Sequence, residues 1–135
     1  MTVDLLVMTL DEVDGIKKIM PKVKKEWVDR IIIVDGGSTD GTIEEARKMG
    51  FEVLVQKEKG WGEGFLMGAN ASNADYIIMW GPDGNFEPEE IPKFAELARE
   101  GYYDQVIISR FAKTSVNEDA GLFDAFGNRM FTFLA

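Results

Sequence analysis

The chain has 135 residues, 45% of them hydrophobic, and a formal net charge of −9. This length and apolar content suffice for one compact domain with a hydrophobic core, and the negative charge argues against nucleic-acid binding, which needs a basic face. The chain contains no Cys and no His, which excludes disulfides, thiolate or imidazole metal sites and catalysis by a Ser-His pair.

Apolar runs alternate with helical patterns along the chain. In chain order, we predict strands over residues 3–9, 30–35, 51–56, 75–80 and 104–109. Helical patterns follow the first four strands, over residues 13–27, 42–50, 61–72 and 88–101. Pro21 is expected to break or kink the first helix, and Gly50 and Gly101 to end two of the others. Strands that alternate with helices across short loops predict an α/β fold with a parallel sheet and helices on both faces.

Polar residues follow every predicted strand. These segments are residues 9–12, 35–38, 57–62, 81–85 and 109–110. Parallel strands end at the same edge of a sheet, where such folds bind ligands. Taken singly, each segment has a simpler interpretation as a turn or a helix cap, but five of them at one edge favour a binding site.

Two Gly-containing segments lie at this edge. In VDGGSTDGT (residues 34–42), glycines allow close backbone approach, and Ser38, Thr39 or Asp40 are candidate caps of the next helix. Asp35 is an acid at the end of an apolar strand, where it can accept hydrogen bonds from a nucleoside base or ribose. The second segment, KEKGWGEG (residues 57–64), matches neither a dinucleotide-binding fingerprint nor an ATPase phosphate loop.

The combined pattern resembles the family 2 glycosyltransferases. It consists of TLDE after the first strand, VDGGSTDGT after the second, KGWGEG after the third, and an acidic strand end followed by PEEIPKF. The chain is most similar to the branch with dolichyl-phosphate mannosyltransferase and related polyprenyl-phosphate sugar transferases. The resemblance implies a GT-A type, Rossmann-like three-layer sandwich with a mostly parallel sheet. It implies a nucleotide-sugar-binding core over residues 1–110 and an acceptor-side loop and amphipathic helix over residues 111–135.

The resemblance also implies a UDP- or GDP-linked sugar as donor. The positions that it assigns to nucleotide binding are Thr9, Leu10, Glu12, Asp35, Gly37, Lys59, Gly60, Gly62 and Pro82. The family's Asp-x-Asp metal motif falls on residues 81–83, so that Gly81 replaces the first acid and Asp83 keeps the second. Asn85 stands where family members often have Gln, which makes Asp83 and Asn85 the implied ligands of Mg²⁺ or Mn²⁺. Trp61 stands where relatives often have Lys.

Catalysis in such an enzyme consists of stabilising the nucleoside diphosphate as it leaves. The resemblance gives this role to Asp83, through the metal, and to Arg110, a donor-phosphate contact. An acceptor lipid phosphate is already anionic and needs no general base. A hydroxyl of a glycan or polysaccharide precursor of the cell envelope needs a carboxylate base, for which Glu118, Asp119 and Asp124 are the candidates.

Two other functions fit the same residues. One is a non-catalytic nucleotide-sugar-binding domain that acts within a complex. The other is a nucleotidyltransferase, which is less favoured because no Gly-rich loop with Arg and Lys follows the first strand.

Location and assembly are expectations from composition. No apolar run approaches the ~20 residues of a membrane span and no signal-peptide pattern is present, so we expect a cytoplasmic protein. The lysines between residues 17 and 25 form a solvated helix face, with attraction to the inner face of the cell membrane as the alternative. The apolar C-terminal helix, which ends in MFTFL, is expected to pack on a second copy, a partner or a membrane surface.

Overall fold

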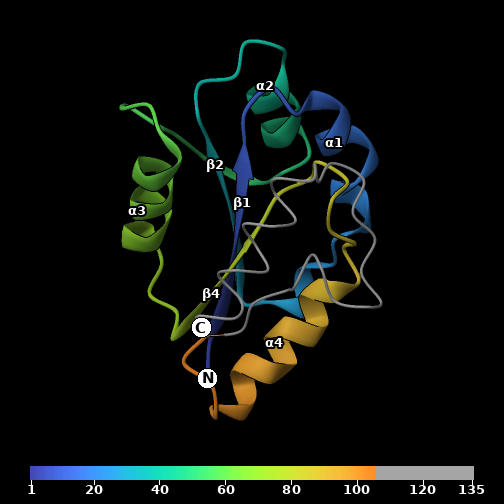
Figure 1. Ribbon diagram of the computed structural model, residues 1–135. Coiled ribbons are helices and arrows are strands. Elements are labelled where there is room, and N and C mark those ends of the chain that lie inside the picture. Colours follow the sequence, from blue (N-terminus) through green and yellow to red (C-terminus); the bar gives the residue numbers. More distant parts are fainter. Residues whose placement is uncertain (106–135) are drawn as a thin grey trace, which may run out of the picture. The chain divides into compact units, whose positions relative to one another are not determined.

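Residues 1–105 are described by a computed structural model, in which four parallel strands form one sheet (Figure 1). The strands are β1 (Val3–Thr9), β2 (Arg30–Asp35), β3 (Glu52–Val55) and β4 (Tyr76–Trp80). Their order across the sheet is β3-β2-β1-β4, and the register sets Thr9 beside Asp35. The predicted α/β fold with a parallel sheet is therefore confirmed.

Helices cover both faces of this sheet (Figure 1). They are α1 (Val13–Lys18), α2 (Thr42–Lys48), α3 (Trp61–Ala71) and α4 (Glu90–Glu100). The helix predicted over residues 13–27 is shorter than expected, since α1 ends at Lys18 and two 3₁₀ turns follow, Met20–Lys22 and Lys25–Trp27. Pro21 lies in the first of these turns. Its missing N–H and fixed φ explain why the α-helix does not continue through it.

The core has two parts, one on each face of the sheet. On one face, Leu6, Ile32 and Val34 are buried under the apolar side of α3, which adds Phe65 and Met67. On the other face, a larger cluster joins the sheet to α1, α2 and α4, through residues that include Val7, Ile16, Ile33, Ala46, Trp80 and Ile91. The near-continuous apolar sequence of β1 and β2 follows from this burial on both faces.

Two glycines allow α3 to lie close to the sheet. A Cβ on Gly68 would lie 2.7 Å from Leu6 Cδ1, and one on Gly64 would lie 2.9 Å from Met8 Cε. The two glycines are four residues apart and therefore share one face of the helix. Larger residues there would push α3 away from β1 and β2.

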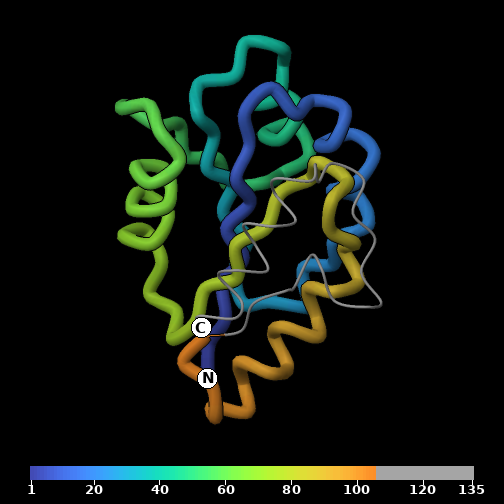
Figure 2. The backbone as a smooth tube through the Cα atoms, viewed as in Figure 1, coloured from blue at the N-terminus to red at the C-terminus, as the bar shows by residue number. Residues whose placement is uncertain are grey.

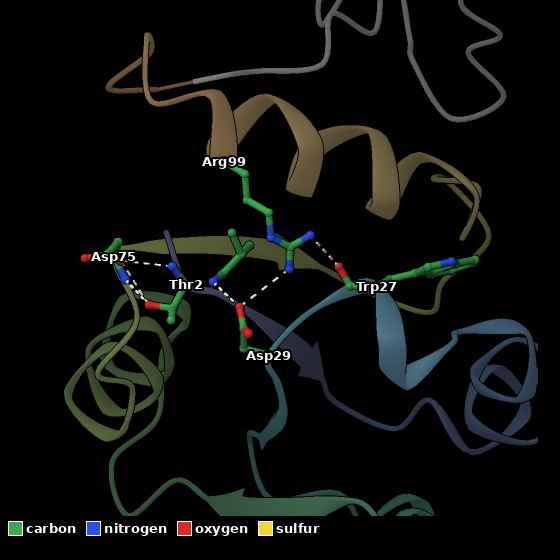
Figure 3. A network of polar contacts seen from close by, with 6 residues as sticks. Thr2, Trp27, Asp29, Asp75 and Arg99 are labelled. Atoms are coloured by element: carbon green, nitrogen blue, oxygen red, sulfur yellow. Dashed lines mark hydrogen bonds and ion pairs between the residues drawn. The ribbon is translucent and has the colours of Figure 1, made fainter.

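Polar contacts close the amino-terminal end of the sheet, where the N-terminus lies near the end of α4 (Figure 2). Thr2 donates to Asp75 through its backbone N–H (2.9 Å), and the Val3 N–H donates to Asp29 (2.7 Å). The Arg99 guanidinium from α4 lies 3.5 Å from the Asp29 carboxylate and donates to the Trp27 carbonyl (Figure 3). The Val3 N–H and then the Arg99 charge lower the pKa of Asp29.

The remaining structural predictions lie outside the described residues. They are the strand over residues 104–109, the C-terminal helix and the division at residue 110. Within residues 1–105, no helix is long and apolar enough to cross a lipid bilayer.

Candidate functional site

The loops after β1, β2 and β4 meet at the carboxyl edge of the sheet, the upper end in Figure 1. These loops carry most of the residues that the sequence indicated, and the Gly-rich segment after β3 leads into α3 beside them. The parallel register explains the arrangement, because strands that run in one direction release their loops at one edge.

Asp35 is the buried centre of this edge. Its side chain is fully buried and accepts four hydrogen bonds. Oδ1 accepts from the backbone N–H groups of Gly37 (2.8 Å) and Ser38 (2.7 Å). Oδ2 accepts from the hydroxyls of Thr9 (2.7 Å) and Ser38 (2.6 Å). The carboxylate thus fixes the loop after β2 against the end of β1. Its contact with a nucleoside stays a prediction, in which a donor group of the nucleoside would share oxygens that already accept these four hydrogen bonds.

Four further hydrogen bonds join the loop after β1 to the loop after β2. The Asp11 N–H donates to Ser38 Oγ (2.8 Å), and the Asp11 carboxylate accepts from the Thr39 N–H (2.9 Å). Asp11 adopts a left-handed conformation with φ of 50°, which these two bonds compensate. The Glu12 N–H donates to Thr42 Oγ1 (2.9 Å), and the Val13 N–H donates to Asp40 Oδ2 (3.2 Å).

Asp40 connects the starts of two helices. Besides the Val13 N–H from α1, its carboxylate accepts the N–H of Thr42 (3.0 Å) and the Thr42 hydroxyl at the start of α2. These bonds, the Thr42 hydroxyl first, lower the pKa of Asp40. The N-cap of α2 is Gly41, with no side-chain cap hydrogen bond, so the prediction that Ser38, Thr39 or Asp40 caps this helix is wrong. Asp40 instead bonds the first residue of α2 and also holds the start of α1.

The Gly-rich loop after β3 is held by Gln56. The Gln56 side-chain Nε2 donates to the backbone carbonyls of Glu58 (3.0 Å) and Gly60 (2.8 Å). Gly60, with φ of 121°, is the N-cap of α3, whose Gly64 N–H donates back to the Gly60 carbonyl (3.1 Å). Lys59, Gly60 and Gly62 are all exposed. The sequence indicated this loop but not Gln56, for which the only signal was a polar amide directly after an apolar strand.

Asp83 and Asn85 lie together in the exposed loop after β4. The Asp83 carboxylate accepts from the Asn85 backbone N–H (3.0 Å) and from its Nδ2 (3.1 Å). The preceding Pro82 is buried and packs on Gly15 of α1, where a Cβ would overlap the Pro82 carbonyl oxygen. Gly15 was a second residue that sequence reasoning missed, because nothing local distinguishes a packing glycine from any other helical glycine.

Acidic side chains converge around this loop. Burial, followed by the negative charges of Asp83 and Asp40, raises the pKa of Glu12. Within residues 1–105, no three acidic side chains gather closely enough to hold a metal ion by themselves. The oxygen atoms of Asp83 and Asn85 are the ligand type that Mg²⁺ and Mn²⁺ accept, and Mg²⁺ keeps several waters and leans on substrate phosphates. The residues present therefore fit a divalent cation whose coordination a bound diphosphate would complete.

The remaining predicted residues are exposed or undescribed. Leu10 is 59% exposed beside the strand ends, and Gly37 (φ of 104°) has open space where a side chain would be. Trp61 is 65% exposed and stacks on Phe65, with ring centroids 6.3 Å apart. Arg110 and the base candidates Glu118, Asp119 and Asp124 lie outside residues 1–105.

Comparison with known proteins shows what the chain is similar to. The family model described as glycosyl transferase family 2 matches residues 5–134. A glycosyltransferase of Haloferax volcanii, AglJ, is 34% identical over 109 residues, which cover 80% of this chain and 36% of the relative. Dolichol-phosphate mannosyltransferase of Pyrococcus furiosus is 26% identical over 121 residues, covering 84% of this chain and 34% of that protein. The chain thus spans about a third of the length of these relatives.

Solved structures with the same fold include an enzyme bound to a nucleotide. Glucosyl-3-phosphoglycerate synthase of Mycobacterium tuberculosis, in complex with Mn²⁺, UDP and glucosyl-3-phosphoglycerate, has a TM-score of 0.57 and 27% identity. The match covers 67% of this chain and 37% of that one. A further mycobacterial protein matches with a TM-score of 0.61 and 29% identity, over 74% of this chain and 37% of the other. The predicted GT-A type architecture is confirmed by these matches.

Proposed function

The chain belongs to glycosyl transferase family 2, and on this basis we propose that it takes part in moving a sugar from a nucleotide-diphosphate donor to an acceptor, with inversion at the anomeric carbon. The observation that carries this proposal is the joining of three strand-end loops at one edge. Asp35 and Asp40 bind the loops after β1 and β2 together, and Gly15 holds the loop with Asp83 against them.

The donor nucleoside would bind between the loops after β1, β2 and β3. Leu10 offers exposed apolar surface there, and Gly37 leaves room for close approach. Thr9 and Asp35, at the ends of β1 and β2, support the loop after β2. Glu12 lies on the side of the site nearest Asp83. The exposed loop with Lys59, Gly60 and Gly62 lies at the start of α3, where a cationic side chain and free backbone N–H groups suit a diphosphate.

Asp83 and Asn85 would hold Mg²⁺ or Mn²⁺ next to the diphosphate. A bound divalent cation would neutralise negative charge that develops on the leaving nucleoside diphosphate. Asp83 is pre-oriented for this role by the two hydrogen bonds from Asn85. The pKa of the neighbouring Glu12 is raised by burial and then by the charges of Asp83 and Asp40, and its carboxylate adds negative potential that favours a cation at this position. We assign Arg110 a second contact with the donor phosphates.

The acceptor class follows from the relatives rather than from the described residues. Dolichol-phosphate mannosyltransferase matches over most of this chain, which supports a polyprenyl phosphate as acceptor. A phosphate oxygen attacks without losing a proton, so this acceptor requires no general base. A glycan hydroxyl would require one, and the three acids beyond residue 110 remain the candidates. We propose action at the inner face of the cell membrane, where such a lipid is accessible.

A nucleotide-sugar-binding domain without catalytic activity is the second candidate. The observation in its favour is Gly81, which leaves one acid of the metal motif, together with the absence of a three-acid cluster within residues 1–105. Family membership disfavours the nucleotidyltransferase alternative.

Calorimetric titration of the full chain with UDP-glucose and GDP-mannose, with Mn²⁺ or with EDTA, tests the donor site. We expect one of the two donors to bind. Asp83→Ala should weaken the affinity for that donor at least tenfold in Mn²⁺ and should change the affinity little in EDTA. Glu96→Ala, an exposed acid on α4, is the matched control and should bind as the wild type does. Unchanged affinity of Asp83→Ala in Mn²⁺ would refute the metal assignment.

Turnover separates the two candidate functions. Incubation of the donor that binds with a polyprenyl phosphate and Mn²⁺ should release the nucleoside diphosphate and form the lipid-linked sugar. Binding without transfer to any lipid phosphate or glycan acceptor, and without donor hydrolysis, would favour the binding domain.

A further inference from the structure

We propose that Gln56 reads the base of the donor nucleotide. Its side-chain Oε1 accepts a hydrogen bond from a ring N–H of the base, which selects uracil or guanine over cytosine and adenine. This inference rests on the proposed function, because it assigns base specificity to the same site.

The orientation of the Gln56 amide is determined by its partners. Nε2 donates to the carbonyl oxygens of Glu58 (3.0 Å) and Gly60 (2.8 Å). Both partners are acceptors, so only the NH₂ end of the amide can face them. Both N–H groups are used there, and Oε1 must therefore point away from the loop.

Oε1 lies between Gly36 of the loop after β2 and Gly64 in the first turn of α3. A Cβ on Gly36 would lie 3.5 Å from Oε1, and a Cβ on Gly64 would lie 2.5 Å from it. Neither glycine places a side chain on this oxygen, and a side chain at position 64 would overlap it. The backbone of Gln56 is fixed as well, because its N–H donates to the Asp35 carbonyl (2.8 Å).

Gln56 Oε1 differs from the neighbouring carboxylates in that no hydrogen bond within residues 1–105 uses it. Asp35 Oδ1 accepts two hydrogen bonds from the loop after β2, and Oδ2 accepts one from that loop and one from Thr9 of β1. Asp40 is used by Val13 and Thr42. In residues 1–105, no donor is bonded to Gln56 Oε1. The acid that the sequence suggested for contact with the base is thus occupied, and a neutral amide oxygen stands beside it.

Apolar surface adjoins this acceptor. Leu10 is 59% exposed, and its Cδ1 would lie 3.4 Å from a Cβ on Gly36, the same glycine that lies beside Oε1. An exposed leucine beside a lone hydrogen-bond acceptor suits a planar base, which has an apolar face and polar edges. Gly36 therefore lies next to both the exposed Leu10 side chain and the Gln56 amide oxygen.

The chemistry of the bases then gives the selectivity. Uracil carries a hydrogen at N3 and guanine carries one at N1, and either can donate to Oε1. Cytosine N3 and adenine N1 carry lone pairs instead, which would face the oxygen without a hydrogen between them. A site built around a hydrogen-bond acceptor rejects such analogues because its polar group is left unpaired.

Titration of the full chain with UDP, CDP, GDP and ADP in Mn²⁺ tests this proposal. We expect the wild type to favour UDP over CDP, or GDP over ADP, by about tenfold or more. In Gln56→Ala this ratio should fall to about one, because the affinity for the favoured nucleotide decreases. Circular dichroism and the Tm would show that the variant is folded.

A loop variant separates base reading from bracing of the loop. Gly60→Ala strains a residue at φ of 121° and disturbs the same loop without removing Oε1. It should weaken the binding of all four nucleotides equally and keep the affinity ratios of UDP to CDP and of GDP to ADP. The base-reading role is wrong if Gln56→Ala keeps the wild-type preference for UDP over CDP or GDP over ADP. It is also wrong if Gly60→Ala loses this preference to the same extent. Either result leaves the proposed function intact. If none of the four binds to the wild type, the proposed function fails together with this inference.

Discussion

Gly15 of α1 contacts Pro82, the residue before Asp83, so closely that a Cβ on Gly15 would overlap the Pro82 carbonyl oxygen and lie 3.2 Å from Pro82 Cβ. The start of α1 is itself held by Asp40, through the Val13 N–H. The position of Asp83 relative to the loop after β2 is therefore set by a chain of contacts that runs through one short helix.

Gly15→Ala should move the Asp83 loop. The added methyl group cannot be accommodated unless α1 or the Pro82 backbone shifts, and overpacking of this kind costs about 1–3 kcal/mol. We expect a lower Tm and a weaker effect of Mn²⁺ on nucleotide affinity, measured by thermal unfolding and calorimetry. Gly62→Ala in α3 is the control for stability, because its Cβ would meet nothing within 4 Å. A Gly15→Ala variant as stable as the wild type would contradict the contact.

Asp35→Asn should destabilise the carboxyl edge of the sheet. An amide nitrogen cannot accept, so the two donors that face one of the oxygens lose their acceptor, at a cost of about 2–4 kcal/mol. Thr9→Val removes one donor and leaves the carboxylate bonded to the loop, so its loss should be about 1 kcal/mol. Urea unfolding of the three proteins measures both values, and equal losses would show that the carboxylate is not the centre of the network.

Glu12→Gln should change how stability depends on pH. Burial and the charges of Asp83 and Asp40 raise the pKa of Glu12 above 4.5, so the folded chain binds this proton more tightly than the unfolded chain does. Stability that is present below that value is lost as the pH rises through the raised pKa. The Tm of the variant minus that of the wild type should be near zero at about pH 3.5 and positive at pH 7. A constant difference across this range would argue against the shift.

The amino-terminal end of the sheet should affect stability without affecting binding. The Val3 N–H and Arg99 lower the pKa of Asp29 below 3.8, so their stabilisation is present above that value and is lost as the pH falls through the lowered pKa. Asp29→Ala should reduce the Tm at pH 7 more than Arg99→Ala does, because it leaves the Val3 N–H without its acceptor (Figure 3). Both variants should bind nucleotide as the wild type does, since the network lies opposite the candidate site.

Much of the fold was predictable because its signals are local. The strands β1 and β2 occupy the residues that their apolar runs indicated, and Gly101 ends α4 in a left-handed conformation as expected of a terminal glycine. The helical pattern over residues 13–27 is broken near Pro21 as expected, with α1 ending at Lys18 and 3₁₀ turns following it. A helical spacing of apolar residues continued past Pro21, and 3₁₀ turns can bury residues at similar spacing.

The candidate site was predictable as an edge but not as a set of contacts. Strand ends, glycines and Asp83 could be placed from the pattern, because parallel strands release their loops on one side. Asp35 was correctly placed at this edge, but the pattern could not show that four donors surround it, three from the loop after β2 and one from Thr9 of β1. The role of Gln56 has no sequence signal, because only the folded loop turns its two N–H groups toward carbonyls and leaves its oxygen without a donor in residues 1–105.

The sequence by itself determined the order of strands and helices, the family and the edge that carries the polar loops, since periodicity and turn residues act over a few neighbours. Only the tertiary structure decided which polar atoms are used within the protein and which are left for a ligand. Hydrogen bonds such as that from Thr9 to Asp35 join residues 26 positions apart, and their existence depends on strand register and on how closely α1 and α3 approach the sheet.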